Sequence, residues 1–399
     1  MSCPAPAGVR EERSGLELAD IFRAHGHRLS RLSRDQSRAA GAIVACRTAA
    51  LGGHVEECDR CRYRQNAFNS CRNRHCPKCQ ALDQADWVDR RMQDLLPVEY
   101  FHVVFTIPEE LHALFLASSR TAYGLLFSSV AATLHEVAAN PENLGARIGF
   151  LSVLHTWTQT LLYHPHIHCI VTGGGLTVHG DRWASCSRRF FVHVKRLSKV
   201  FKGKLLDALE QAIDRGLFDM RKSKAHVHLR AAAAKEDWVV YAKRPFAGPE
   251  QVLKYLSRYT HRIAISNQRL VEMRDGRLTF RWKDRDHGDQ PKLMTLDAVQ
   301  FLRRFLLHVL PAGFVKIRSY GILANGCKAK MLRRCRALLG VAVAADMAAA
   351  PADECWEDRL LRLTGKDVTA CPACRVGKLI RIADIPRHSS CMWSRIRGP

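Results

Sequence analysis

The chain has 399 residues, 47% of them hydrophobic and 25% charged, which is typical of a globular protein with a core and excludes a largely disordered chain. Its 62 Lys and Arg against 38 Asp and Glu give a net charge of +24. This charge favours a polyanionic partner, and nucleic acid is favoured over a membrane surface. The alternative explanation is a GC-rich genome, in which arginine is frequent. The sequence contains neither a signal peptide nor a run of about eighteen apolar residues, so we expect a cytoplasmic protein without membrane contact.

The first third of the chain is expected to contain helices, a cysteine-rich segment and one strand. Residues 16–51 and 109–138 have apolar positions at three- and four-residue spacing, which is typical of helices. The cysteine-dense segment 54–80 lacks this spacing and leads into a short helix at 81–97. Residues 99–107, EYFHVVFTI, alternate between apolar and other side chains, which predicts a strand.

Strands and helices follow one another irregularly in the rest of the chain. Residues 148–160 and 166–172 are predicted as neighbouring strands, with a turn at the three glycines 173–175. The remaining expected elements are a basic helix at 195–215, a strand at 237–243, a helix from Pro249, a hairpin at 269–283 with an Asp-Gly turn, helices at 295–309 and 327–339, and a strand at 314–317.

This order of elements predicts an α+β fold with an antiparallel sheet, because strict strand–helix alternation is missing. We expect a disordered tail at 1–15, a helical and zinc-binding domain at 16–97, and a catalytic domain at 98–340. Residues 341–399 are expected to form an Ala-rich linker and a short tail that contains CPAC at 371–374.

The spacing of four cysteines predicts a zinc site. Cys58 and Cys61, then Cys76 and Cys79, form two Cys-x-x-Cys pairs at a separation typical of four-cysteine zinc sites, and disulfides are rare in a reducing compartment. Redox dithiols and buried free thiols are the alternatives. Two questions stay open. The first is whether this site, or a second ion, also includes Cys71, His75 or His54. The second is whether CPAC binds a metal together with Cys391, His388, Cys327 or Cys335, or binds nothing.

Basic side chains stand beside these cysteines. Arg72, Arg74 and Lys78 lie in the stretch SCRNRHCPKC, where a rigid metal-bound knuckle could present them to DNA. The alternative is a zinc site that only stabilises the fold.

The stretch LLYHPHIHCIV at 161–171 places His164, His166 and His168 on one face of a strand. Hydrogen-bonded core histidines and a zinc hydrolase site are two interpretations, although no HExxH motif accompanies them. A third is a metal site that serves a nucleophile elsewhere. Tyr255 and Tyr259 are candidates, because residues four apart on a helix project from one face, and a phenol that attacks a phosphodiester needs a cation nearby. Ordinary helix packing is the alternative for both tyrosines.

Together these motifs resemble a known family. His166-Ile167-His168 followed by Tyr255 and Tyr259 is similar to the HUH motif and tyrosine pair of the two-tyrosine HUH transposases of bacterial rolling-circle insertion sequences. CRTAALGGH at 46–54 and NSCRNRHCPKCQ at 69–80 resemble the zinc-binding domain of those proteins. The resemblance covers about residues 18–340. It departs at RSYG (318–321) and ANGCK (324–328), where fewer basic or imidazole groups could weaken a DNA contact.

The resemblance implies a central antiparallel sheet whose middle strand presents the two histidines, with the tyrosine helix packed beneath. It implies that a tyrosine attacks single-stranded DNA at an element end, which leaves a 5'-phosphotyrosine and a free 3'-hydroxyl, and that this link later rejoins DNA without ATP. HUH enzymes usually add a third metal ligand, for which Gln159 is the first candidate, His155 the second and His164 the third. With an oxygen-bearing ligand, Mg2+ or Mn2+ is expected there, and Zn2+ at the cysteines.

Three basic residues flank the tyrosines and are expected to hold the scissile phosphate: Lys254, Arg258 and Arg262. The expected partners are single-stranded DNA at the ends of an element and target DNA. Two alternative functions remain, a replication initiator or relaxase with the same chemistry, and a non-catalytic zinc-dependent DNA-binding protein.

Overall fold

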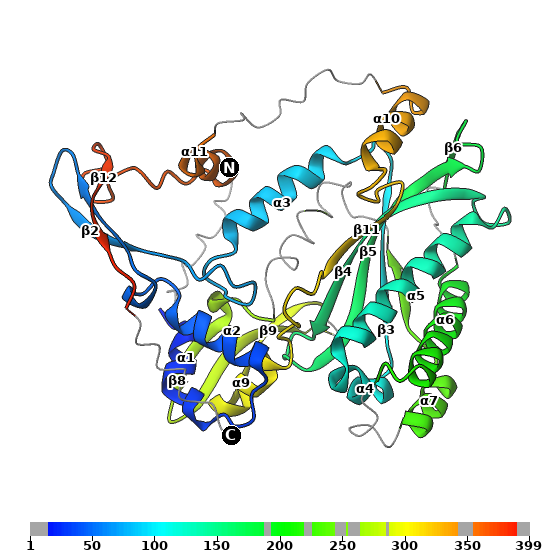
Figure 1. The fold of residues 1–399 in the computed structure, drawn as a ribbon, viewed down its shortest axis with the longest axis horizontal. Coiled ribbons are helices and arrows are strands. Elements are labelled where there is room, and N and C mark those ends of the chain that lie inside the picture. Colours follow the sequence, from blue (N-terminus) through cyan, green and yellow to red (C-terminus); the bar gives the residue numbers. More distant parts are fainter. Residues whose placement is uncertain are drawn as a thin grey trace, which may run out of the picture.

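The computed structural model describes residues 15–186, 193–218, 226–243, 253, 264–284, 287–341 and 354–388. It confirms a mixed α+β fold in which the described strands pair antiparallel (Figure 1). The α-helices are α1 (Leu18–His25), α2 (Arg34–Ala45), α3 (Ala81–Gln93), α4 (His112–Ala117), α5 (Ser119–Ala139), α6 (Val194–Asp214), α7 (His226–Lys235), α9 (Ala298–Leu306), α10 (Lys328–Leu338) and α11 (Trp356–Thr364). The strands are β1 (Gly53–Cys58), β2 (Arg64–Phe68), β3 (Tyr100–Thr106), β4 (Ala146–Trp157), β5 (Tyr163–Thr177), β6 (Trp183–Ser185), β7 (Val240–Lys243), β8 (Leu270–Arg274), β9 (Arg277–Asp284), β10 (Gln290–Asp297), β11 (Ile317–Gly321) and β12 (Leu379–Ile385).

The largest sheet has the strand order β11-β4-β5-β3-β7, with β6 paired to β5. Strand β5, which carries the His-Ile-His motif, is the middle strand of this order. Helices α5 and α6 lie along one side of the sheet (Figure 1). Side chains such as Phe105, Ile167 and Val171 join the core on that side together with Phe127 and Leu134 of α5.

The opposite side of the sheet has a smaller cluster at one end. It consists of Tyr100, Leu151, Val153 and Ile170, with Trp87 of α3 packed against it. Because side chains alternate along a strand, His155 shares the face of Leu151 and Val153, and His166 and His168 share the face of Ile170. The histidines thus lie on the side that α3 covers only in part.

The three glycines at 173–175 do not form the predicted turn; β5 continues through them to Thr177. Neighbouring backbones approach too closely for a side chain at these positions. A Cβ atom on Gly174 would lie 2.5 Å from the carbonyl oxygen of Ala184, and one on Gly175 would lie 2.5 Å from that of Arg147. Glycine within a strand often indicates such a close approach of another backbone.

The predicted hairpin at 269–283 is confirmed as β8 and β9, and its turn residues Asp275 and Gly276 have φ values of 51° and 72°. Positive φ at both positions is characteristic of the primed turns that suit hairpins. A third strand, β10, was not predicted, and six of its eight residues are exposed. Strand β11 begins at Ile317, later than the predicted strand at 314–317.

The N-terminal helices α1 and α2 pack against α9, the helix that follows the three-stranded sheet β10-β9-β8. The rings of Phe22 in α1 and Phe305 in α9 lie 6.0 Å apart, and the Gln36 side chain donates to the carbonyl of Leu306 at 3.0 Å. Residues of the segment 16–97 therefore share a core with residues near 270–310.

The predicted short tail also contributes to an N-terminal sheet. Strand β12 pairs with β1, and β1 pairs with β2, in the order β12-β1-β2. Among the helices that the structure describes, none is both long and apolar enough to cross a membrane.

Candidate metal centres and nucleic-acid contacts

Three histidines meet on β4 and the middle strand β5, near the end of the large sheet where these two strands are connected. His155 of β4 is paired directly with His166 of β5, and His168 follows two residues later on the same face. One ring nitrogen from each lies within 4.8 Å of the others, and the side chains of His155 and His168 are 3% and 7% exposed. We call His155, His166 and His168 the histidine triad.

Hydrogen bonds orient two of these rings. The Nδ1 atom of His166 lies 2.6 Å from the carbonyl oxygen of His164 and must donate to it, since a carbonyl only accepts. The Nδ1 atom of His168 lies 2.8 Å from Nε2 of His102 on β3. Both contacts are made by Nδ1, and metal-bound imidazoles usually have such a contact on the ring nitrogen that does not bind the metal.

The structure corrects the expected position of Gln159. Strand β4 ends at Trp157, so Gln159 lies in the turn after it, and the residue opposite His166 is His155. Arg269 donates to the Gln159 backbone carbonyl from outside the strand pair. His164 is not part of the triad, and its ring lies 5.9 Å from that of His112. The register of β4 and β5 also shifts between His155 and Trp157.

The donor set of the triad fits a divalent metal ion. Three neutral imidazoles suit transition metals, whereas Mg2+ prefers oxygen ligands and water. The expectation of Mg2+ or Mn2+ rests on an oxygen-bearing third ligand. With three nitrogen ligands the site favours a transition metal over Mg2+.

The predicted nucleophiles Tyr255 and Tyr259 lie outside the described residues, and so do Lys254, Arg258 and Arg262. Within residues 244–263 the structure describes only Leu253, which is buried.

The four cysteines predicted to share one ion belong to two different clusters. Cys76 and Cys79 meet Cys71 and also Cys46, which follows α2. The ligand atoms lie within 4.8 Å of one another, and the sulfurs of Cys71 and Cys79 are 3.7 Å apart. We call these four residues the N-terminal cysteine cluster. The open question about Cys71 is answered, because Cys71 contributes to this cluster.

Cys58 and Cys61 instead meet Cys371 and Cys374 of the CPAC stretch. The cause is the pairing of β12 with β1, which brings residues more than 300 positions apart to the same end of the small sheet. We call these four residues the terminal cysteine cluster. CPAC therefore has a partner that the sequence alternatives did not include.

Neither neighbouring histidine joins a cysteine cluster. His54 pairs with Glu56 at 2.9 Å. His75 accepts a hydrogen bond on Nε2 from the backbone of Leu310 at 3.1 Å, while its Nδ1 lies 3.0 Å from the Asn73 side-chain oxygen. Burial lowers the pKa of His75 to about 3, so this ring is neutral and connects the N-terminal cysteine cluster to the loop before β11.

Two of the three basic residues beside the cysteines are engaged within the protein. Arg74 donates to the carbonyl of Phe314 at 2.6 Å, and burial lowers the pKa of its guanidinium. Lys78 forms an ion pair with Glu17. Arg72 is exposed.

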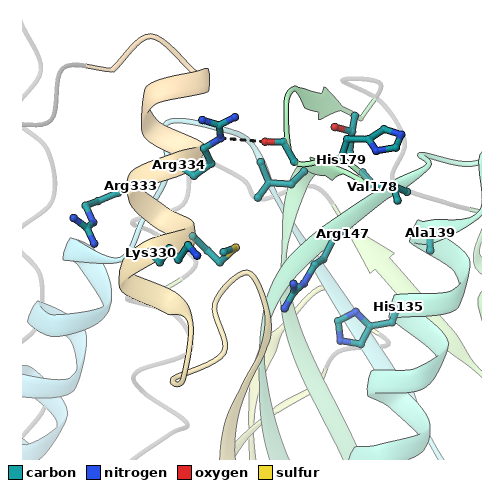
Figure 2. A pocket seen from close by; sticks show the side chains of 13 residues that line it. His135, Ala139, Arg147, Val178, His179, Lys330, Arg333 and Arg334 are labelled. Atoms are coloured by element: carbon teal, nitrogen blue, oxygen red, sulfur yellow. Dashed lines mark hydrogen bonds between the residues drawn. The ribbon is translucent and has the colours of Figure 1, made fainter.

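A basic cavity of about 900 Å3 lies at the opposite end of the large sheet. Figure 2 shows Lys330, Arg333 and Arg334 of α10 on one side and Arg147 of β4 with His135 of α5 on the other. Arg334 donates to the carbonyl of Gly180 at 3.1 Å, which attaches α10 to the loop after β5. No Asp or Glu is among the lining residues that the structure describes. Such a site suits anionic groups.

Sequence reasoning missed His102, Cys46 and the role of CPAC. His102 lies within the predicted strand at 99–107, but its position beside β5 depends on the order of strands in the sheet, which the sequence does not show. Cys46 stands alone, without a Cys-x-x-Cys partner, and so gave no spacing signal.

Comparison with known proteins identifies the family of this chain. Residues 149–330 match a family model described as "Putative transposase", and residues 17–107 match one described as "Transposase zinc-binding domain". A protein of Sinorhizobium fredii named "Putative transposase y4qJ" is 50% identical over 381 residues, which cover 93% of this chain and 96% of that protein. The chain belongs to this transposase family.

A more distant relative is the "Transposase for insertion sequence element IS801" of Pseudomonas savastanoi pv. phaseolicola. It is 29% identical over 294 residues, which cover 71% of this chain and 69% of the relative. No solved structure matches the chain significantly. Family membership supports a transposase function that acts on DNA, and the cysteine clusters with the matched zinc-binding domain support Zn2+ as a cofactor.

Proposed function

We propose that this chain cuts and rejoins single-stranded DNA at the ends of an insertion sequence through Tyr255 and Tyr259, in rolling-circle transposition. The observation that carries the proposal is the histidine triad on the middle strand of the antiparallel sheet. Three imidazole nitrogens within 4.8 Å of one another form a donor set that suits a divalent metal ion.

In the proposed reaction the phenol oxygen of one tyrosine attacks the phosphorus of a phosphodiester. A tyrosine–phosphate bond forms, the bond from phosphorus to the 3' oxygen breaks, the phenol loses its proton, and the released 3' oxygen gains one. A divalent cation held by His155, His166 and His168 would polarise the phosphate and offset charge in the transition state. His164 and His102 keep the ligand rings in place through the Nδ1 atoms of His166 and His168. A 3'-hydroxyl then attacks the phosphotyrosine and reverses these bond changes.

The remaining predicted residues are proposed as a zinc site and as DNA contacts. We propose Zn2+ at Cys46, Cys71, Cys76 and Cys79 as a structural ion. Arg72 contacts DNA beside it, and Lys254, Arg258 and Arg262 hold the scissile phosphate.

The test is incubation of the full chain with single-stranded oligonucleotides from the ends of its own element and Mn2+. We expect a covalent protein–DNA adduct that is resistant to denaturation and carries the 5' end of the cut strand. Tyr255→Phe with Tyr259→Phe removes both nucleophilic oxygens and should abolish the adduct, while Tyr241→Phe serves as the matched control. An adduct that persists in the double variant would exclude these nucleophiles, and binding without any adduct would favour the non-catalytic DNA-binding protein.

The same assay distinguishes transposition from replication initiation. A transposase should join one cut element end to a second end or to target DNA, whereas an initiator or relaxase should cut a single origin strand and reclose it. Joined products of two different oligonucleotides are therefore expected.

The basic cavity is proposed as a contact for DNA phosphates away from the cut. Arg147 and His155 are eight residues apart on β4, which corresponds to roughly 26 Å along a strand. In the described part of the chain, Arg147, Lys330 and Arg333 form no ion pair with a carboxylate. Their charges are thus available for phosphates.

Replacing Lys330 and Arg333 with Gln is expected to weaken binding about equally for all DNA sequences. The slope of log affinity against log salt concentration should become shallower by about 1.4 for single strands, because two phosphate contacts are lost. Fluorescence anisotropy over a salt series measures both quantities. Arg274→Gln with Arg277→Gln, at the exposed β8–β9 turn, is the charge-matched control, and an equal effect of both pairs would contradict a specific contact at the cavity.

A further inference from the structure

We propose that the terminal cysteine cluster, Cys58, Cys61, Cys371 and Cys374, binds a second Zn2+ that attaches the C-terminal segment to the N-terminal hairpin. The segment in question is residues 354–388, which contains α11 and β12. Two of the four ligands lie far beyond residues 17–107, the range that matches the transposase zinc-binding domain. The site is therefore an addition to that domain.

The distances between the sulfurs fit a tetrahedral ion. Cys58 and Cys374 have sulfurs 3.7 Å apart, and so have Cys61 and Cys371. Four thiolates at about 2.3 Å from a central Zn2+ have sulfurs about 3.8 Å apart in a regular tetrahedron. A disulfide requires about 2.05 Å, so neither pair is oxidised.

Backbone amides around the sulfurs are arranged to stabilise thiolates. The amides of Arg60 and Cys61 point at the sulfur of Cys58, at 3.4 and 3.5 Å, and the amide of Gly377 points at that of Cys374 at 3.3 Å. Amides within the first Cys-x-x-Cys turn, and one just after the second, therefore donate to a sulfur of that turn. Hydrogen bonds to the charged form of a group favour that form, and thiolates are the form that binds Zn2+.

The two turns are also joined directly to each other. The backbone amide of Lys378 donates to the Asp59 side chain at 2.8 Å, and the Asp59 amide donates to the Lys378 carbonyl at 3.0 Å. A Cβ atom on Gly377 would lie 2.5 Å from the Cys58 sulfur, so glycine is required for this approach. The knuckles are held at the separation that one shared ion needs.

The C-terminal segment has almost no core of its own. Within 354–388 only Cys371 and Gly377 are buried, and β12 is exposed along most of its length. Helix α11 contacts α3 through the ion pairs Arg359–Asp86 and Arg362–Asp89, and the second pair, with side chains 39% and 38% exposed, contributes at most about 1 kcal/mol. A segment that buries so little apolar surface requires another source of stability, and a metal ion supplies it in many small domains.

Zinc content of the full chain tests the proposal. Metal analysis of the purified protein is expected to show one zinc fewer per chain for Cys371→Ser with Cys374→Ser. Cys58→Ser with Cys61→Ser should also remove one, and the combination of all four substitutions should still remove only one, because both pairs share a single ion. Cys327→Ser with Cys355→Ser is the matched control and should leave the zinc content unchanged.

Limited proteolysis supplies a second readout. Loss of the ion should expose residues 354–388 to cleavage in the Cys371→Ser, Cys374→Ser variant, while the rest of the chain keeps its protease resistance and its melting transition. Unchanged zinc content in that variant, or a loss of two ions on combining all four substitutions, would overturn the proposal. DNA cleavage is not part of either measurement, so failure of the proposed reaction at Tyr255 and Tyr259 leaves this test intact.

Discussion

Replacing His168 with Ala is expected to reduce DNA cleavage by about a thousandfold, because it removes a ligand from the centre of the histidine triad. Charge stabilisation by a bound divalent ion contributes several kcal/mol to a transition state, and about 4 kcal/mol corresponds to a thousandfold. His155→Ala should have an effect of the same order, since His155 faces His166 directly in the sheet. Single-turnover cleavage of an end oligonucleotide measures the rate.

His102→Ala should cost less, about 10- to 100-fold, because His102 contacts the ring of His168 and acts as a positioning residue. Raising the metal concentration should partly restore this variant but not His168→Ala. His112→Ala is the matched control, since its ring packs on His164 and lies outside the triad. Equal losses in the His102 and His112 variants would indicate a general packing defect.

The donor set leads to a metal preference that the same assay can measure. With His155 as the third nitrogen ligand, Mn2+ should support cleavage at lower concentration than Mg2+. If Gln159 supplied an oxygen ligand instead, Gln159→Ala would weaken Mg2+-dependent cleavage and His155→Ala would be nearly silent.

Replacing Cys76 and Cys79 with Ser is the second change with a large expected effect. We expect the loss of one zinc per chain and unfolding of residues near 46–80, because structural Zn2+ contributes about 10 to 16 kcal/mol of apparent binding energy in small modules. That amount is comparable with the entire stability of a domain, which is about 5 to 15 kcal/mol.

Cleavage should fall as well, although these cysteines are not near the triad in the sequence. Arg74 and His75, next to the N-terminal cysteine cluster, hold the backbone of Phe314 and Leu310 in the loop before β11. Strand β11 pairs with β4, which carries His155, so the loss of this contact affects the sheet at the triad. Metal analysis, thermal unfolding and cleavage are the measurements.

Arg72→Ala is the control for the cysteine variants, because Arg72 lies in the same knuckle but is exposed. It should keep the zinc content and the melting temperature and lower only DNA affinity. If the Cys76, Cys79 variant keeps both zinc and melting temperature, the N-terminal cysteine cluster does not hold a structural ion.

Local patterns were sufficient for those features that depend on neighbouring residues. Alternation over 99–107 predicts β3, the Asp275-Gly276 pair predicts the β8–β9 hairpin, and the order of elements predicts the antiparallel α+β fold; the structure confirms all three. Periodicity of two also places His166 and His168 on one face of a strand, since a strand's geometry repeats every second residue.

The remaining features of the metal sites depend on how the strands pair in the folded protein. Whether His155 or Gln159 faces His166 depends on the register of β4 and β5 and on where the turn between them begins, which residue spacing alone does not specify. Cys-x-x-Cys spacing identified metal-binding turns, but it could not tell which turns share an ion. Strand β12 pairs with β1, which brings Cys371 and Cys374 to Cys58 and Cys61. Tetrahedral coordination depends on this proximity in space and not on proximity in the sequence.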